Sequence, residues 1–306
     1  MINIYLSVND ELVQIKSPEK GAWINIINPS EEELEHAAAI TGIFYDFLKY
    51  PLDDEERPRV EIEDNQLLII LNVPIIYQAS VMYDTIPLGI IITNDYITTI
   101  CLQNIDIVTD FAKGKVKGMA TYKKTRFVFQ LMQKASILYL KYLREINKKT
   151  DEIELKLHKS MRNQELISLL DLEKSLVYFS TSLRSNEKVM EKLLRTLKMY
   201  EEDHDLLEDV IIENKQAIEM ADIYSNILSS TMSSFASIIS NNLTIVMKFL
   251  AAITIVVSLP TMVASFFGMN VSLPFENTPH GFLIVLGIST ALSGLSIWYL
   301  IKRNVF

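Results

Sequence analysis

The sequence predicts an N-terminal α/β domain, then long helices, then a C-terminal pair of membrane-spanning helices. Three observations predict this class: short β-branched runs in the first third, a helical tract without glycine or proline in the middle, and two uncharged apolar runs near the end. The 306 residues suffice for one soluble domain plus a membrane part. We expect the α/β domain over 1–120 and a long-helix stalk region over 121–242.

The N-terminal third alternates strand-like and helical segments. One helix has clear limits: Ser30 is a plausible N-cap, Glu33 completes a capping box, and Gly42 is suited to the C-terminal end. Together they predict an α/β domain and leave the order of its strands open. The expected strands are the β-rich runs INIYLSV, WINII, QLLIILNVPII, IPLGIIIT and YITTI.

The middle of the chain contains neither glycine nor proline from Met119 to Leu259. A tract of this composition predicts very long helices. Polar stretches at 160–165 and 200–205 are the expected turns, which gives three helices. The last begins at about Leu206 and continues into the membrane, and its roughly sixty residues would reach about 90 Å. A rod of that length suits a bundle of several copies around an axis.

Two apolar runs predict a membrane hairpin. Phe249–Gly268 and Gly281–Ile301 carry no charge, and each has about the twenty residues that a spanning helix needs. Two buried core helices are the alternative, although core helices rarely lack a polar face over this length. We expect a first transmembrane helix over 243–268, an external loop over 269–280 and a second transmembrane helix over 281–301.

The positions of lysine and arginine predict the orientation. Lys248 lies just before the uncharged run of the first span, Lys302 and Arg303 follow the second in a basic tail (302–306), and the connecting loop has none. The positive-inside rule therefore places both termini in the cytoplasm of a multi-pass protein in the plasma or inner membrane. The first residues resemble no signal peptide.

Composition argues against several functions. The net charge of −9 falls on the cytosolic part, so nucleic acid is not an expected partner. The single cysteine, Cys101, excludes a disulfide framework and a cysteine-rich metal site, and we expect it to be a small buried hydrophobe. The segment GKVKG lacks the ending of a phosphate loop, and no nucleophile elbow or catalytic triad pattern is found. We expect no enzymatic activity and no organic cofactor.

One face of the first span differs from the others. Residues that are small, with the exception of Met247, recur there at spacings of three and four, and five of them carry a hydroxyl, while the flanking positions are bulky and apolar. Such a face suits either a close helix–helix seam or a narrow hydrated path. We call it the polar stripe: Thr244, Met247, Ala251, Thr254, Ser258, Thr261 and Ser265.

Neighbouring residues favour the hydrated path. The stripe continues to Asn270 at the outer end, and Pro260 cannot donate to the Val256 carbonyl, which bends or loosens the helix. Leu250 adjoins the stripe as a pore-lining candidate that could close a path by dewetting. Lys248 could place positive charge at the cytosolic mouth or serve as an interfacial anchor.

The segment FFGMN at the end of the first span, with the tail IKRNVF after the second, resembles the CorA family of magnesium transport channels. The resemblance is specific over Asn241 to Phe306. It implies a homopentameric funnel in the lipid membrane, with Mg²⁺ as both transported and regulatory ion and Co²⁺ as a further cargo. It also implies an entrance filter of Gly268, Met269 and Asn270. Because Mg²⁺ gives up its waters reluctantly, such a filter could bind the hydrated ion.

The resemblance further implies a cytosolic magnesium sensor that closes the pore. Counting back from the filter places Asp209 at the sensor position, with Asp205 and Glu213 as assisting carboxylates. Divalent ions would bridge such charges between subunits; a solvated acidic face is the alternative. The acidic run at 53–56 is generic, and the external loop departs from the family because Glu276 is its only acid.

Two other functions stay open. Related two-span proteins transport Zn²⁺, Co²⁺ or Ni²⁺, but this chain offers one cysteine and histidines without a paired spacing, so its hydroxyls and amides favour a hard hydrated ion. A membrane-anchored scaffold that transports nothing would need no polar stripe. The histidines are His36, His158, His204 and His280.

Overall fold

The structure is a computed structural model that describes residues 1–306 except 10, 78–81, 161–162, 198, 270–278 and 304–306. The chain divides into two compact units, Met1–Ser230 and Thr231–Phe306. The first contains a β-sheet with helices on both faces, and the second contains the apolar C-terminal helices. The predicted fold class is confirmed.

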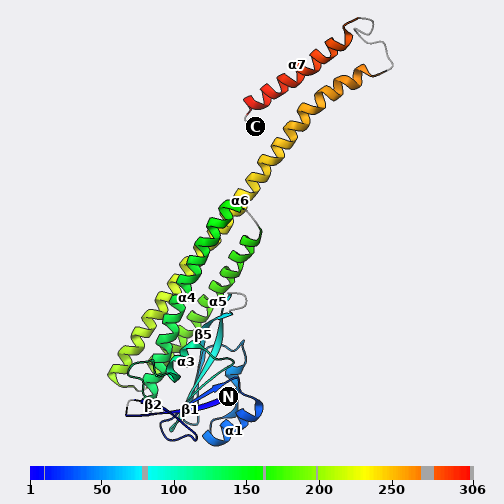
Figure 1. Ribbon diagram of the computed structural model, residues 1–306. Helices are drawn as coiled ribbons and strands as arrows, with labels where there is room; N and C mark the ends of the chain where they lie inside the picture. The colour runs from blue at the N-terminus through cyan, green and yellow to red at the C-terminus, as the bar shows by residue number, and fades with distance from the viewer. Residues whose placement is uncertain (10, 78–81, 161–162, 198, 270–278, 304–306) are drawn as a thin grey trace. The chain divides into compact units, whose positions relative to one another are not determined.

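The first unit contains a seven-stranded mixed sheet (Figure 1) with the order β2-β1-β3-β7-β6-β5-β4. Neighbouring strands are antiparallel except β3 and β7, which are parallel with Trp23 beside Ile97 and Ile27 beside Cys101. The strands are β1 (Ile2–Val8), β2 (Glu11–Ile15), β3 (Trp23–Ile27), β4 (Arg59–Glu63), β5 (Gln66–Tyr77), β6 (Met82–Ile92) and β7 (Ile97–Cys101).

All five predicted runs form strands, and the two strands that were not predicted, β2 and β4, are the two edges of the sheet. Their sequences, ELVQI and RVEIE, mix charged and apolar residues, and most of their side chains are partly or fully exposed. An edge strand needs fewer apolar residues than a central one, so composition alone identifies it poorly.

Four short helical segments accompany the sheet, three between β3 and β4 and one after β7. The first, α1 (Glu31–Thr41), has the predicted limits: Ser30 and Glu33 form the reciprocal capping box, and Gly42 ends the helix with a left-handed φ of 70°. The other three were not predicted and have five, three and seven residues. They are α2 (Tyr45–Lys49), the 3₁₀ helix η1 (Tyr50–Leu52) and α3 (Asp106–Ala112).

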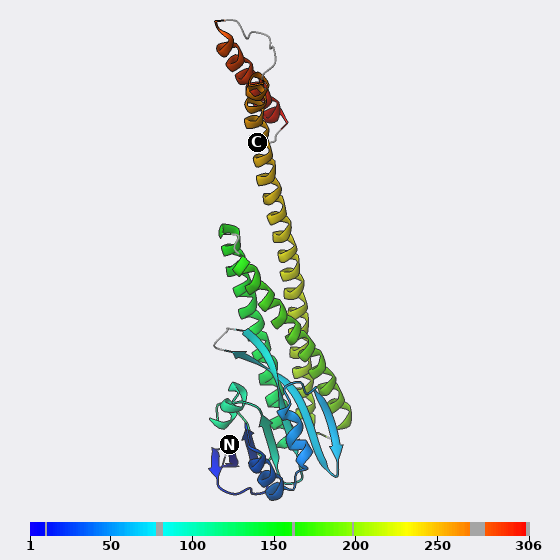
Figure 2. The ribbon, with the colours of Figure 1, turned by 90° about the vertical axis from the view of Figure 1, so that its right-hand side faces the viewer.

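The sheet has a separate core on each face. On one face Ile24, Ile26 and Ile100 pack with Leu34 of α1 and Phe47 of α2. On the other face the buried core contains residues of α3 and of the three long helices (Figure 2). Cys101 is buried in this second core, as predicted, and burial raises the pKa of its thiol to about 12.

Three long helices follow, as the absence of glycine and proline predicts: α4 (Lys124–Ser160), α5 (Asn163–Thr196) and α6 (Glu201–Phe267). The helix α6 begins a few residues before the predicted start and continues through Pro260. Its 67 residues correspond to about 100 Å. The last helix is α7 (Gly281–Lys302).

A polar contact joins α5 to the sheet. Asn186 on α5 accepts a hydrogen bond from the backbone N–H of Asn72 at 2.9 Å and donates one to its carbonyl oxygen at 2.7 Å. Tyr139 of α4 donates to the same carbonyl at 2.9 Å. The two helices therefore supply polar partners to the backbone of β5.

Candidate ion pathway

Two helices, α6 and α7, are long and apolar enough to cross a membrane. Many of their large apolar side chains are exposed in the single chain, among them Phe282 at 78% and Leu295 at 62%. A soluble protein rarely exposes apolar surface so continuously. The second unit is therefore suited to lipid and to contacts with further copies.

The polar stripe lies on the uncovered side of α6. Within the described part of the first span, only Ala252 and Val263 are buried. Eleven positions separate these two residues, so they share one side of the helix, and the stripe residues lie between about a quarter and half a turn away from Ala252. Every residue of the stripe, and Leu250 beside it, is exposed: Thr244, Met247, Leu250, Ala251, Thr254, Ser258, Thr261 and Ser265.

The stripe hydroxyls donate to their own helix. Thr254 donates to the Leu250 carbonyl at 2.8 Å, and Thr261 donates to the Val257 carbonyl at 3.1 Å. The hydroxyl oxygens remain able to accept hydrogen bonds. A hydrated cation presents its water hydrogens outward, so these acceptors match its surface. A groove of about 730 Å³ follows this side of the helix and includes Thr254, Ser258, Thr261 and Ser265.

The predicted filter is only partly inside the described residues. Gly268 donates its N–H to the Ala264 carbonyl at 2.9 Å, and Met269 donates to the Phe266 carbonyl at 3.3 Å, so both continue the last turn of α6. The backbone of Gly268 is not left-handed, and a β-carbon there would meet Ala264 oxygen at an ordinary 3.4 Å. Asn270 lies outside the described residues.

The predicted basic mouth has two kinds of environment. Lys302 lies 5.1 Å from the ring centre of Trp298, and Arg303 lies 5.7 Å from that of Tyr299. Cations and amphipathic aromatic rings are typical of a membrane–water interface. Lys248 is exposed on α6 within the predicted first span. Lys302 and Arg303 thus have contacts typical of interfacial anchors.

The predicted sensor residues lie on the first part of α6. Asp205 and Asp209 are exposed, and Glu213 is half-buried. Burial raises the pKa of the Glu213 carboxyl, and the charge of Asp209 raises it further, against an opposing hydrogen bond with Gln133. Asp209 and Glu213 are therefore close enough to interact, while Asp205 lies one turn earlier.

The structure also forms a group that the sequence analysis did not identify. Ligand atoms of His204, Asp205 and Glu208 lie within 4.8 Å of one another. The Nδ1 atom of His204 is 3.5 Å from Glu208 Oε1. The four-residue spacing of His204 and Glu208, which places both on one helix face, was the available signal. Such a group could hold a divalent ion.

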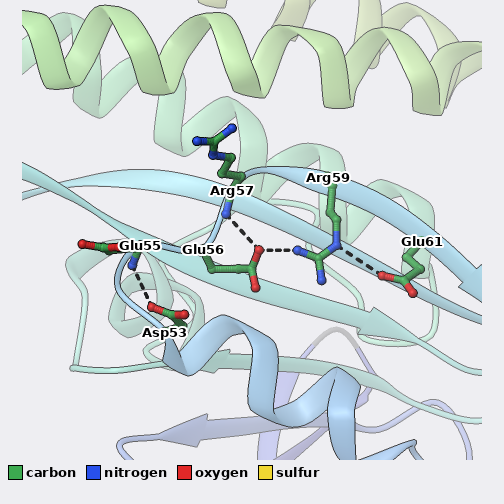
Figure 3. Close-up of polar contacts among 6 residues, drawn as sticks. All are labelled: Asp53, Glu55, Glu56, Arg57, Arg59 and Glu61. Atoms are coloured by element: carbon green, nitrogen blue, oxygen red, sulfur yellow. Dashed lines mark hydrogen bonds and ion pairs between the residues drawn. The ribbon is translucent and has the colours of Figure 1, made fainter.

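The acidic run at 53–56 is engaged in its own loop (Figure 3). Asp53 accepts a hydrogen bond from the N–H of Glu55 at 3.0 Å, and Glu56 forms an ion pair with Arg59. Arg59 also pairs with Glu61 at 3.2 Å. These contacts fix the turn before β4 and support the interpretation of this run as generic.

The sheet domain, the long helices and the two apolar C-terminal helices together define the architecture of a two-span membrane protein. The family described as CorA-like Mg²⁺ transporter protein matches residues 18–303, and the chain belongs to this family. It is therefore a divalent cation transporter, and the predicted family resemblance is confirmed.

Three comparisons, two of them with one protein, show the extent of the similarity. The cobalt/magnesium transport protein CorA of Methanocaldococcus jannaschii is 29% identical over 294 residues, which cover 92% of this chain and 90% of that protein. The complete structure of the CorA magnesium transporter from the same organism has a TM-score of 0.87 at 25% identity, covering 99% of this chain and 98% of that one. The structure of the full-length CmaX protein has a TM-score of 0.74 at 17% identity, covering 100% of this chain and 97% of that one. At this identity the similarity shows the fold alone.

Proposed function

We propose that the chain forms a channel that conducts Mg²⁺, and also Co²⁺, into the cell down the electrochemical gradient. The observation that carries this proposal is the polar stripe, which α6 leaves exposed opposite its covered side. Lipid would leave its hydroxyl oxygens without donors, whereas water around a cation supplies them. The membrane potential supplies about 2.3 kcal/mol per charge per 100 mV, doubled for a divalent ion.

The stripe becomes a pore wall only in an assembly. A single helix cannot enclose a path, so several copies of α6 must surround an axis. The family resemblance implies five copies, with both termini in the cytoplasm. The relatives whose printed names include magnesium and cobalt transport support the choice of ion.

The entrance filter is the second part of the proposal. Gly268 and Met269 directly follow Phe267, the last residue of α6, and Asn270 is the next residue in the sequence. Asparagine amides in a ring could hydrogen-bond the water shell of Mg²⁺, which the ion holds tightly. Selection would then act on the hydrated ion.

Flux into liposomes tests the pore and the filter. Purified protein is reconstituted around a Mg²⁺-sensitive dye, and we expect uptake that Asn270→Ala reduces at least tenfold, the effect of about 1.4 kcal/mol on the barrier. Asn163→Ala, at the exposed start of α5, is the matched control and should leave uptake unchanged. Absence of wild-type uptake, or full uptake in the filter variant, would contradict the proposal.

Closure by cytosolic Mg²⁺ is the third part. Asp209 on α6 is exposed and interacts with Glu213, so an ion bound there would relieve the repulsion between carboxylates. Asp209→Ala should keep the uptake but weaken its inhibition by internal Mg²⁺. Glu219→Ala, another exposed carboxylate of the same helix, is the control. Unchanged inhibition in Asp209→Ala would remove Asp209 from the sensor.

Transport of Zn²⁺, Co²⁺ or Ni²⁺ is the alternative, and one observation favours it. The group of His204, Asp205 and Glu208 contains an imidazole, a ligand that transition metals prefer and Mg²⁺ does not. The same liposomes with a Zn²⁺-sensitive dye compare the ions. Faster uptake of Zn²⁺ than of Mg²⁺ would favour the alternative.

A further inference from the structure

The sheet has a crevice at the carboxyl ends of its parallel strands. After β3 the chain enters α1, which packs on one face, and after β7 it enters α3, which packs on the other. In α/β sheets, such a divergence between adjacent parallel strands opens a crevice in which ligands commonly bind. A cavity of about 580 Å³ lies here, lined by residues of β1, β3, α3 and the segments that follow both strands. This volume is typical of small-molecule sites.

The deepest polar side chain in this crevice is Asn25, which is 2% exposed. Its orientation follows from a chain of hydrogen bonds: Trp23 Nε1 donates to Thr99 Oγ1 at 2.8 Å, and Thr99 Oγ1 donates to Asn25 Oδ1 at 3.1 Å. Because an indole nitrogen can only donate, the threonine must accept from it and donate its own hydrogen onward. The amide oxygen of Asn25 therefore faces Thr99, and its NH₂ group faces away.

The side chain of Asn25 is almost wholly buried, and its NH₂ group has no acceptor among the residues that the structure describes. A ligand that accepts a hydrogen bond from this group would therefore make a contact that the protein itself does not supply. Asn25 lies directly beside Asn3 in the register of β3 and β1. The two amides thus belong to one patch of the sheet.

Two more asparagines of the crevice show the same arrangement. Asn3 Oδ1 accepts from Gln14 Nε2 at 3.1 Å, and Asn104 Oδ1 accepts from Thr109 Oγ1 at 2.9 Å. Each amide oxygen is occupied by the protein, and each NH₂ group remains to donate. All three asparagines line the cavity, so it has three neutral amide groups that can donate.

The charged groups that line the crevice are cations, Lys113 and the Met1 ammonium, of which the Met1 ammonium is paired with Glu33 at 2.9 Å. Lys113, exposed after α3, adds an ammonium group, and Tyr5 adds a phenol whose pKa is raised by burial, so it stays protonated and can donate. Among the described residues that line the cavity, none carries a carboxylate. Such a lining offers donors to an anion and few acceptors to a cation.

We propose that this crevice binds a small oxyanion, the carboxylate or phosphate group of a soluble molecule. Oxyanions accept several hydrogen bonds at once, and bonds to a charged acceptor are the stronger ones. The site uses Asn25, Asn3 and Asn104 as neutral donors and Lys113 as the charge partner. It is separate from the cation path, because none of its residues belongs to α6.

Calorimetric titration of the full chain in detergent, at constant ionic strength, tests the site with inorganic phosphate and with citrate. We expect saturable binding of at least one probe. Lys113→Gln should weaken it about tenfold, since a hydrogen bond to a charged group contributes on that scale. Lys115→Gln, which removes the same charge two residues later where Lys115 pairs with Asp110 at 2.9 Å, should leave the dissociation constant unchanged.

Asn104→Asp keeps the shape of an exposed side chain and replaces the donor with a carboxylate, so it should weaken binding by more than Lys113→Gln. Binding of phosphate alone would identify a site for a phosphate-bearing ligand, and binding of citrate alone would identify a site for a carboxylate-bearing ligand. Binding of both probes would identify a site that accepts either group. No saturable binding of either probe to the wild-type chain would overturn the proposal. An equal loss of affinity in Lys113→Gln and Lys115→Gln would overturn the proposal as well.

Discussion

The two units of the molecule treat apolar side chains in opposite ways. In Met1–Ser230, large residues such as Trp23 and Phe127 are fully buried, whereas in Thr231–Phe306 residues such as Val257 and Phe282 are more than half exposed. The first unit satisfies its apolar surface internally through the hydrophobic effect. The second can do so only with lipid and with further copies of the chain. Stability should therefore depend on the first unit's core and conduction on the second unit's exposed faces.

The largest expected effect is the loss of a buried aromatic ring. Phe127 lies 5.2 Å from the ring of Trp23 and 5.0 Å from that of Phe111. Phe127→Ala should lower the free energy of unfolding by about 3–5 kcal/mol, because it removes a buried ring and leaves a cavity. The measurement is urea unfolding in detergent, followed by the fluorescence of Trp23 in a Trp298→Phe background.

Phe282→Ala is the matched change in the second unit. The ring of Phe282 is 78% exposed, so its removal should change the unfolding of the first unit by less than about 0.5 kcal/mol. If Phe127→Ala and Phe282→Ala lowered the free energy of unfolding equally, the contrast between the two units would be wrong.

An intermediate effect is expected on the polar stripe. Ser258 is exposed on α6 and lies in the groove beside Thr254 and Thr261. Ser258→Leu should reduce Mg²⁺ uptake by liposomes about tenfold while leaving urea unfolding unchanged, because it replaces an acceptor along the path with a bulky apolar group. Ser296→Leu makes the same substitution on α7 and should conduct normally. If both variants conducted like the wild type, the stripe would be a packing seam.

The smallest expected effect concerns Glu213. Its carboxyl pKa is raised in the folded chain, so the protonated form is favoured by folding. That contribution is fully present below the unfolded pKa of about 4.3 and is lost as pH rises through the folded pKa. Glu213→Gln imitates the protonated form, so it should stabilise the chain by a few tenths of a kcal/mol at pH 7 and by nothing at pH 4.

Unfolding curves at the two pH values measure the difference for Glu213→Gln. The exposed Glu219 supplies the control variant Glu219→Gln, for which we expect no pH-dependent gain. A destabilised Glu213→Gln at pH 7 would show that the ionised carboxylate supports the fold.

Sequence patterns predicted the elements whose residues share one environment. The central strands are rich in isoleucine and other apolar residues because both of their faces are covered, and the long helices lack glycine and almost all proline, so both classes were predictable. The edge strands β2 and β4 and the short helices α2 and α3 were not, because short half-exposed segments carry little periodicity. Likewise, His204, Asp205 and Glu208 form a group because a helical turn brings their ligand atoms close together.

By itself the sequence determined the class of the protein, the number of long helices, the two spans and the polar stripe, because each depends on composition or on spacing along one segment. Tertiary structure alone decided which residues from distant segments meet. Asn186 of α5 reaches the backbone of Asn72, and the hydrogen bond from Trp23 to Thr99 turns Asn25 toward the crevice. The physical reason is that a hydrogen bond depends on distance and direction in space, and residues far apart in the chain acquire both only when the sheet and its helices have packed.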